Sequence, residues 1–518
     1  MIREGDEAAR LRGRPLTRSR GAWAGCALAL LVACGGAPGD PGTEPRERPR
    51  NRHLLIVIDG LRPDYVTPAL MPNLHALGER GVVFTDHHAV YPTVTRVNAA
   101  SISTGAYPET HGLMGNAVFF PKVDPAGFLN TADRSNLLRI EQAEAGRLLT
   151  APTLGESLQE AGRRMLVVSA GSAGSSFLLN HRVAGGGIIH HEYALPEALG
   201  HSVRERLGPP PAGAIPQHAL NRYIVDSFLE VGLGHVDPAV TVIWLTEPDT
   251  TAHSLGIGHP TSMEAIRGVD DELERLQRRL RAAGRLDEFN IWVTSDHGFS
   301  THTGGVDIEA LLAPFAARQP DGSPRIVTAG GAIYVRDGDP ATIAHVVEAL
   351  QAAARVGAIF TRDGSVPGTL PLDLARLTHP RAADILYSPA WTDAANEHGY
   401  RGTSASGGTA GHGSTSPYDV LGVLIAAGPD LRSGVTAGLP SSNADLAPTF
   451  LALLGLEAPE SMTGRVLTEA WTDRSGAPAE PRSEEVTAET SDGVYRVIAH
   501  RSVVAGHRYL DAATAERR

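Results

Sequence analysis

Short apolar runs alternate with amphipathic stretches from His53 onward, and this alternation is typical of a mostly parallel sheet wrapped by helices. The runs that we expect to form strands cover residues 56–58, 82–84, 165–169, 242–245, 291–293 and 420–426. The stretches that we expect to form helices cover residues 70–81, 98–104, 153–162, 261–283 and 444–454. The pattern therefore predicts an α/β fold with a mostly parallel central sheet.

Several segments interrupt this alternation. Residues 117–150 and 170–215 are loop-rich, and we interpret them as insertions over the functional site. A third insertion, residues 311–407, holds a small β-α-β unit, with strands at 331–335 and 357–360 around a helix at 340–355. We expect a main domain over residues 51–475 and a tail over 476–518 that ends in a β-hairpin.

The first residues have a different composition from the rest. Several arginines precede an apolar run at residues 22–33, which is too short to span a membrane and is typical of an export signal. The run ends in Leu-Val-Ala-Cys34, which resembles the bacterial lipobox and would make Cys34 a lipidated residue. We therefore expect a lipoprotein-type signal peptide at 1–33, a flexible tether at 34–50, and an exported, membrane-anchored protein on the periplasmic side or cell surface. An ordinary signal peptide that contains a cysteine is the alternative.

Charge and cysteine content narrow the possible partners. Without residues 1–33 the chain has 40 basic and 55 acidic residues, a formal charge of −15. Such a chain has no electrostatic reason to bind a nucleic-acid backbone as its main partner. Both cysteines, Cys26 and Cys34, lie in or next to the signal, so the domain beyond them has no disulfide. Its stability must come from its core and from any bound metal. Nothing in the sequence indicates an oligomeric state.

Six side chains that commonly bind metal ions occur in a suggestive order along the chain. Apolar runs lead into Asp59, Asp249 and Asp296, and ligands in open α/β sheets bind where strands end in loops. Zn²⁺ accepts Asp and His ligands together. Each residue alone is explained as a turn or loop residue, but the ordered set indicates a site for two metal ions. The set is Asp59, Asp249, His253, Asp296, His297 and His412.

A threonine-rich turn at residues 91–95 supplies a candidate nucleophile, Thr95. A threonine hydroxyl needs activation, and a metal ion within bonding reach would stabilise its alkoxide. If Thr95 also begins a helix, the N-terminus of that helix favours the anionic group it attacks. Asn98, one turn later, could donate a side-chain hydrogen bond to a substrate oxygen. The alternative is a Thr95 that only caps the helix.

Seven short segments carry a family resemblance: residues 57–64, 71–74, 91–98, 104–112, 247–253, 294–298 and 411–413. In this order they resemble the nucleotide pyrophosphatase/phosphodiesterase (type I phosphodiesterase) family of the alkaline phosphatase superfamily. The resemblance implies an alkaline-phosphatase-like α/β/α sandwich with inserted subdomains. It spans roughly residues 53 to 467.

The resemblance also implies an activity and roles for residues. It assigns the six candidate ligands to two zinc ions: Asp249, His253 and His412 to one, and Asp59, Asp296 and His297 to the other. Thr95 would be the nucleophile between the ions, and Asn98 would hold the phosphate. The expected reaction is hydrolysis of phosphate diesters or nucleotide pyrophosphate bonds in a small phosphorylated substrate, through a phosphothreonine.

The sequence around the nucleophile departs from the family pattern. Members commonly have Lys-Thr-Phe-Pro-Asn-His there, whereas residues 94–99 are Val-Thr-Arg-Val-Asn-Ala. The change removes an aromatic ring that could stack on a substrate. It adds Arg96, which can bind an anion with two parallel hydrogen bonds. Arg96 either favours a substrate with extra negative charge, such as a phosphomonoester, or forms a salt bridge with a neighbouring acid.

The same residues allow several other functions to be compared with this one. A phosphomonoesterase or phosphonate hydrolase that uses the same metals and Thr95 is the main alternative. A sulfatase is excluded because the chain has no Cys/Ser-x-Pro-x-Arg segment. A phosphoglycerate mutase of the same superfamily is cytoplasmic, which the export signal opposes. A metal-free lipoprotein that binds a ligand is a remote alternative, since it predicts damaged ligands and all six are present.

Overall fold

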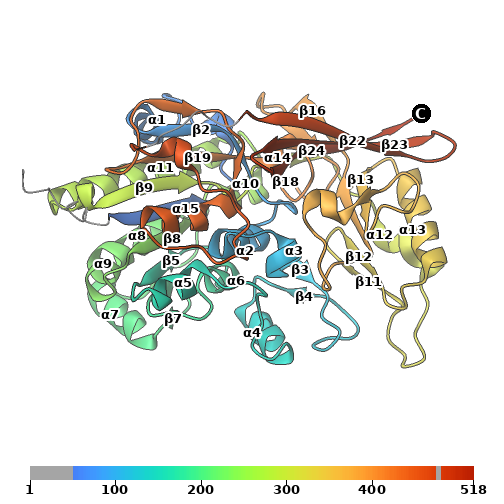
Figure 1. Ribbon diagram of the computed structural model, residues 1–518, viewed down its shortest axis with the longest axis horizontal. Helices are drawn as coiled ribbons and strands as arrows, with labels where there is room; N and C mark the ends of the chain where they lie inside the picture. The colour runs from blue at the N-terminus through green and yellow to red at the C-terminus, as the bar shows by residue number, and fades with distance from the viewer. Residues whose placement is uncertain (1–50, 474–479) are drawn as a thin grey trace, which may run out of the picture. The chain divides into compact units, whose positions relative to one another are not determined.

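The most apolar runs of the sequence form the centre of one large sheet (Figure 1). The computed structural model describes residues 51–473 and 480–518. Strand β1 (Arg52–Ile58) lies between β8 (Val240–Leu245) and β9 (Phe289–Thr294) and is parallel to both. All residues of β8 and β9 are buried, as expected for strands covered on both faces.

The sheet continues on both sides of these three strands, in the order β20-β2-β19-β9-β1-β8-β5-β6-β7, with β21 beside β2. Strand β19 is antiparallel to both of its neighbours and β7 is antiparallel to β6, while the other pairs are parallel. The additional strands are β2 (Val82–His88), β5 (Met165–Ser169), β6 (Gly187–His190), β7 (Ala194–Leu195), β19 (Leu421–Ala427), β20 (Val435–Ala437) and β21 (Ser441–Ser442).

Helices cover both faces of the sheet. Alternate residues of β1 enter two separate apolar cores, with Ile56 in one and Val57 in the other. The first core is covered by α1 (Pro72–Glu79), α7 (Glu197–Leu207), α8 (His218–Ser227), α9 (Leu233–His235) and α11 (Pro260–Ala282). The second is covered by α2 (Thr95–Thr104), α4 (Arg134–Ala143), α5 (Leu154–Glu160), α6 (Ala173–Leu179) and α15 (Leu446–Leu453). The predicted three-layer α/β/α fold is confirmed.

The stretch over residues 170–215 differs from its prediction. It contributes β6, which pairs with β5 and widens the central sheet, and the covering helices α6 and α7. It is therefore part of the sandwich and not an insertion over the site. The pattern was hidden because α6 consists largely of Gly, Ser and Ala, which give little apolar periodicity although six of its residues are buried.

The inserted region near residues 311–407 forms a separate sheet with covering helices (Figure 1), and its apolar core includes residues from other parts of the chain, such as Phe119 and Tyr495. Its five-stranded sheet has the order β11-β12-β15-β13-β14. The expected strands β12 and β13 are not neighbours, because β15 lies between them and is antiparallel to both. The elements are α12 (Ile308–Leu312), β11 (Ile326–Ala329), β12 (Ala332–Val335), α13 (Pro340–Ala352), β13 (Val356–Thr361), β14 (Leu370–Pro371) and β15 (Ile385–Pro389).

Two smaller sheets and several short helices lie outside the central sheet and the sheet of the inserted region. One sheet has the order β16-β17-β10-β18, and the other pairs β3 with β4. Their bounds are β3 (Ala117–Val118), β4 (Leu129–Asn130), β10 (Ser300–His302), β16 (Trp391–Ala395), β17 (Arg401–Ser404) and β18 (Ala410–Gly411). The short helices are α3 (Pro108–His111), α10 (Asp249–Leu255) and α14 (Pro417–Val420).

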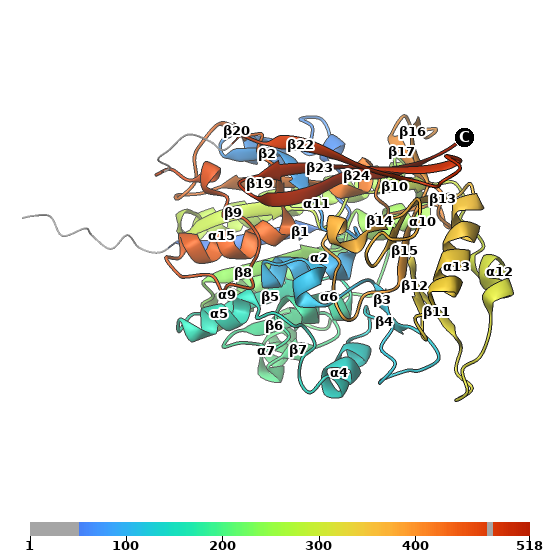
Figure 2. The ribbon, with the colours of Figure 1, turned by 45° about the vertical axis from the view of Figure 1, so that its right-hand side comes forward.

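The last residues form a three-stranded antiparallel sheet, in dark red in Figure 2. Strands β23 (Tyr495–Val504) and β24 (His507–Arg517) pair as a hairpin, and β22 (Arg482–Glu489) adds a third strand. The Tyr509 hydroxyl donates to Asp445 beside the sandwich (3.0 Å), while the Tyr495 hydroxyl donates to the Gly357 carbonyl of the inserted region (2.6 Å). The terminal sheet thus ties these two parts together.

The expected signal peptide, Cys34 anchor and tether lie outside the described residues and stay predictions. Among residues 51–473 and 480–518, no helix has both the length and the apolar character needed to cross a bilayer.

Candidate metal centre and nucleophile

Three adjacent strands deliver acidic side chains to one edge of the sheet. Asp59 follows β1, Asp249 begins α10 just after β8, and Asp296 follows β9. Because these strands are parallel neighbours, their carboxyl ends meet, as the sequence predicted. The backbone N–H of Asp249 donates to the Asp59 carbonyl (3.2 Å), which fixes the two loops to each other.

Each of the three candidate histidines has its imidazole oriented by the backbone. The Nδ1 atoms of His253, His297 and His412 lie 2.9, 3.0 and 2.8 Å from the carbonyl oxygens of Ala410, Gly298 and Thr93. A carbonyl only accepts, so Nδ1 carries the proton in each ring. In the neutral form this leaves Nε2 with a free lone pair, the arrangement that metal-binding histidines adopt.

The carboxylates present oxygens that lack a partner. Asp59 Oδ1, Asp249 Oδ2 and Asp296 Oδ2 are buried and have no hydrogen-bond partner among the described residues. The opposite oxygens are held in place: Trp244 Nε1 donates to Asp59 Oδ2 (2.9 Å), and the Gly60 N–H donates to Asp296 Oδ1 (3.1 Å). Buried charged oxygens without partners are costly, so this arrangement fits a site built for cations.

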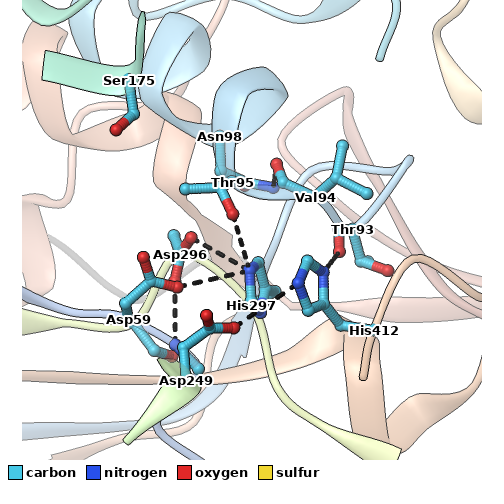
Figure 3. Close-up of polar contacts among 12 residues, drawn as sticks. Asp59, Thr93, Val94, Thr95, Asn98, Ser175, Asp249, Asp296, His297 and His412 are labelled. Carbon is cyan, nitrogen blue, oxygen red and sulfur yellow. Dashed lines mark hydrogen bonds and ion pairs between the residues drawn. The ribbon is translucent and has the colours of Figure 1, made fainter. Parts of the chain in front are cut away.

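These atoms converge in two overlapping groups (Figure 3). Asp249, His253 and His412 offer ligand atoms within 4.8 Å of one another, and so do Asp59, Asp249 and His297. Asp249 thus belongs to both groups. Asp296 lies beside the second, with Oδ2 at 3.1 Å from His297 Nε2. The structure brings together all six predicted residues.

The pKa values reflect this crowding of acids. Burial, and next the carboxylates of Asp296 and Asp249, raise the pKa of Asp59 well above its usual range. For His297 burial opposes protonation, but the carboxylates of Asp296 and Asp249 and the hydrogen bond to Gly298 together outweigh it, and the pKa of the imidazole is raised. Three carboxylates that repel one another in a buried cluster are stabilised electrostatically when a cation binds among them.

Thr95 is the first residue of helix α2 and faces the cluster. Its Oγ1 lies 3.3 Å from His297 Nε2, and its side chain is buried (Figure 3). The preceding Val94 is extended and offers no side-chain cap, so the N-terminal N–H groups of a ten-residue helix are directed toward the region in front of Thr95. A nucleophile here would attack a phosphate stabilised by the helix N-terminus.

Asn98 is placed differently from its expected role. It is fully buried, and its amide nitrogen donates to the carbonyls of Val90 (3.0 Å) and Val94 (3.2 Å). Its Oδ1 accepts from the Val90 N–H (2.8 Å). Both amide hydrogens are therefore taken by the backbone, and Asn98 positions the turn before Thr95 instead of reaching the substrate.

Asn116 is a candidate that the sequence interpretation missed. Its Oδ1 accepts from the Arg96 N–H (3.1 Å) in the first turn of α2, and its amide nitrogen has no hydrogen-bond partner among the described residues. The side chain is half-buried beside the nucleophile helix. Asn116 could not be linked to Thr95 because the two residues are far apart in the sequence. The one feature of the sequence that indicated it was a Gly-Asn turn after residues 104–112.

Arg96 is half-buried, and its Nε has no hydrogen-bond partner among the described residues. Burial lowers the pKa of its guanidinium, while the charges of Asp59, Asp249 and Asp296 act to raise it. It makes no ion pair within 4.0 Å in the described part of the chain, so the salt bridge considered for Arg96 is not formed there.

The family model described as type I phosphodiesterase / nucleotide pyrophosphatase matches residues 53–411. The chain belongs to this family. Two curated relatives are ectonucleotide pyrophosphatase/phosphodiesterase family member 1 of Mus musculus (25% identical over 247 residues, 47% of this chain and 24% of that protein) and bis(5'-adenosyl)-triphosphatase of Xenopus laevis (23% over 264 residues, 50% and 49%). This family member thus aligns with half or less of the length of either relative.

Solved structures show the same fold. Murine ectonucleotide pyrophosphatase/phosphodiesterase 5 superposes with a TM-score of 0.55 at 19% identity, covering 79% of this chain and 96% of that one. An inactive threonine-to-alanine variant of that protein, in complex with AMP, gives a TM-score of 0.54 at 18% identity over the same shares. The alkaline-phosphatase-like sandwich expected of this phosphodiesterase family member is thereby confirmed.

Proposed function

We propose that the protein hydrolyses phosphate diesters or nucleotide pyrophosphate bonds, with Thr95 as nucleophile beside two divalent metal ions. One observation carries this proposal: three buried carboxylate oxygens, which have no hydrogen-bond partner among the described residues, lie beside three oriented imidazoles, and the Thr95 hydroxyl lies 3.3 Å from one of these imidazoles. Family membership supports the reaction class. The AMP complex of the murine relative, whose threonine-to-alanine variant is inactive, supports a nucleotide-like substrate and a threonine nucleophile.

The donor set favours Zn²⁺, because this ion accepts carboxylate and imidazole ligands together. Asp249, His253 and His412 would hold one ion, and Asp59, Asp296 and His297 the other. Such ions supply charge stabilisation for the attacking and leaving oxygens of an in-line displacement. Asp249 belongs to both geometric groups, so its carboxylate could help to hold either ion.

The protein's own residues organise two displacements. The Thr95 hydroxyl loses its proton to solvent, and Oγ1 attacks phosphorus as the bond to the leaving oxygen breaks. The resulting phosphothreonine is then hydrolysed by water, which restores the hydroxyl and releases a phosphomonoester. The Asn116 amide nitrogen donates to a non-bridging oxygen, the role first expected of Asn98. Asn98 keeps Val90 and Val94 fixed, so that Thr95 stays aimed at the cluster.

The decisive experiment compares Thr95→Ala with the unchanged protein on bis-p-nitrophenyl phosphate. We expect the variant to lose turnover by at least ~10³-fold while it keeps its bound metal, since Thr95 contributes the bond-forming atom. Elemental analysis before and after chelation should give about two zinc ions per chain, with activity lost together with the metal. Undiminished turnover in Thr95→Ala, or metal-free protein with full activity, would contradict the proposal.

A phosphomonoesterase is the second candidate, and Arg96 favours it. The Nε of Arg96 is buried beside the nucleophile and has no hydrogen-bond partner among the described residues, so it can bind the additional charged oxygen of a phosphomonoester. Assay of p-nitrophenyl phosphate next to the diester separates the two candidates. A monoester kcat/KM above that of the diester, lost in Arg96→Gln, would assign the protein to monoesters.

A further inference from the structure

A cavity of about 340 Å³ lies beside the candidate metal centre. Its lining includes Val94, which precedes the nucleophile, the candidate ligand His412, and Asn116. The opposite wall comes from the inserted region, where the turn between β11 and β12 and residues of β15 contribute Gly331 and Tyr387. Its volume is that of a small-molecule subsite.

The wall of this cavity carries no formal charge. Among the described residues that line it there is no Asp, Glu, Lys or Arg. Burial raises the pKa of both tyrosines in the lining, Tyr91 and Tyr387, so both are neutral near pH 7. Arg96 does not belong to the lining, although it lies close to the carboxylates.

The lining instead offers neutral contacts. Glycines expose backbone groups along the wall, Asn116 and Ser406 add neutral polar side chains, and the tyrosines add aromatic surface. A second phosphate or a carboxylate placed here would lose its hydration without meeting a cation, and that loss is costly. An uncharged organic group loses little and gains apolar burial.

We propose that this cavity receives an uncharged organic group, such as an aryl group, esterified to the phosphate. This inference rests on the proposed function and narrows its substrate class. Preferred substrates are diesters with at least one uncharged group of this kind, and a group that bears further phosphates is rejected from the cavity. Leaving groups of the nucleoside diphosphate type would have to lie outside it.

The size of the cavity is tested by filling it. Gly407 is one of the lining residues, its φ lies outside the left-handed region, and a Cβ added there meets no described atom within 4 Å. Gly407→Trp is therefore compared with Gly234→Trp, at an exposed glycine of α9 whose Cβ also meets open space. The substrates are bis-p-nitrophenyl phosphate and methyl p-nitrophenyl phosphate.

We expect Gly407→Trp to lower kcat/KM for bis-p-nitrophenyl phosphate by about 10-fold or more. The indole would displace one aryl group from the cavity, and the apolar surface of that group would no longer be buried. Both substrates release p-nitrophenol, but one retains an aryl group on phosphorus and the other a methyl group. If the variant loses less kcat/KM on the methyl ester than on the bis-aryl ester, the cavity holds the retained group. If the two losses are equal, the cavity holds the leaving group. Either result supports the proposal. No loss beyond that of Gly234→Trp overturns it.

The neutrality of the cavity is tested with two competitive inhibitors, diphenyl phosphate and bis(4-carboxyphenyl) phosphate. We expect the unchanged protein to bind diphenyl phosphate, whose aryl groups are uncharged, about 10-fold more tightly than bis(4-carboxyphenyl) phosphate. Ser406→Lys puts a cation in the wall of the cavity and should therefore reduce the ratio of the two inhibition constants. Ser406→Gln adds no charge and should leave this ratio unchanged. Equal inhibition constants in the unchanged protein would refute a charge-selective cavity, whether or not the Trp variant folds.

Different results would contradict the proposed function and the inference about the cavity. A protein without any diesterase activity, with its metal bound, contradicts the proposed function itself. A protein that hydrolyses bis-p-nitrophenyl phosphate through Thr95 but responds to neither cavity variant contradicts only the inference about the cavity.

Discussion

At the scale of single residues, the candidate site is preorganised by its surroundings. Three imidazoles are oriented by backbone carbonyls, and Asp59 is held by an indole and Asp296 by a backbone N–H. Groups held in this way bind a metal without first losing side-chain freedom, so the supporting residues should matter nearly as much as the ligands.

This reasoning gives a matched pair of variants. Trp244→Phe removes the hydrogen bond from Nε1 to Asp59 Oδ2, whereas Trp292→Phe removes an Nε1 that has no partner among the described residues. Both indoles are fully buried on neighbouring parts of the sheet. We expect Trp244→Phe to weaken metal binding about 10–100-fold and Trp292→Phe to leave it nearly unchanged. Competition with a chromogenic chelator measures both, and equal affinities would show that the indole does not orient Asp59.

The six candidate ligands could be predicted from the sequence because five of them follow a strand or start a helix, and His253 lies one helical turn after Asp249. Asn98 was assigned a different role because sequence spacing does not say where a side chain points. In the structure the first turn of α2 directs its amide inward, to Val90 and Val94. Asn116 could not be predicted, since its closeness to Arg96 comes from tertiary folding alone.

At the scale of elements, helix α2 has an unusual beginning. Val94 provides no side-chain cap, and a side chain from outside the helix, Asn116, accepts the N–H of Arg96 instead. A helix capped from a distant loop holds its first residues in place without covering its N-terminus. The Arg96 N–H is taken by Asn116, while the N–H groups of Thr95 and Val97 have no side-chain cap and are available to an anion.

Variants of Asn116 separate capping from contact with the substrate. Asn116→Ala removes both functions, whereas Asn116→Asp keeps the acceptor for the Arg96 N–H and loses the amide donor. We expect both variants to lose about 10²-fold in kcat, but only the alanine variant to lose thermal stability. Steady-state kinetics and thermal unfolding provide the two readouts. Full activity in Asn116→Asp would mean that the residue only positions the helix.

Element boundaries could be predicted best where apolar runs are long. Strand β5 has the predicted bounds, and α11 begins and ends within one residue of its prediction. The neighbours of a strand could not be predicted: β15 enters between β12 and β13 because antiparallel pairing with both depends on the packing of the inserted core. Local sequence carries no record of such long-range pairing.

At the scale of the whole molecule, buried histidines make stability depend on pH. Burial, and then the charge of Arg163, lower the pKa of His53 to about 3, and its ring stacks on Phe450 at 5.2 Å. The unfolded chain binds a proton at His53 below about pH 6.5, whereas the folded chain does not. The free energy of unfolding therefore falls as the pH drops from 6.5 toward 3, and is unaffected by this residue above 6.5.

His53→Phe keeps the aromatic stack and removes the titrating group. We expect the difference in free energy of unfolding between pH 8 and pH 5 to shrink by about 2 kcal/mol in this variant. His201→Gln, at an exposed position, serves as the control for the loss of a histidine. Urea unfolding at the two pH values measures it, and an unchanged pH dependence in His53→Phe would show that this histidine is not buried in its neutral form.

The terminal sheet has a consequence for how the molecule is assembled. The Tyr495 hydroxyl supports the Gly357 carbonyl of the inserted region across 138 residues of sequence, and Tyr509 reaches back to Asp445. Contacts over such separations form late, because the chain must first close a long loop. During synthesis all six candidate ligands leave the ribosome before the strands that brace the wall of the cavity. A nascent chain could therefore bind metal before it can select a substrate.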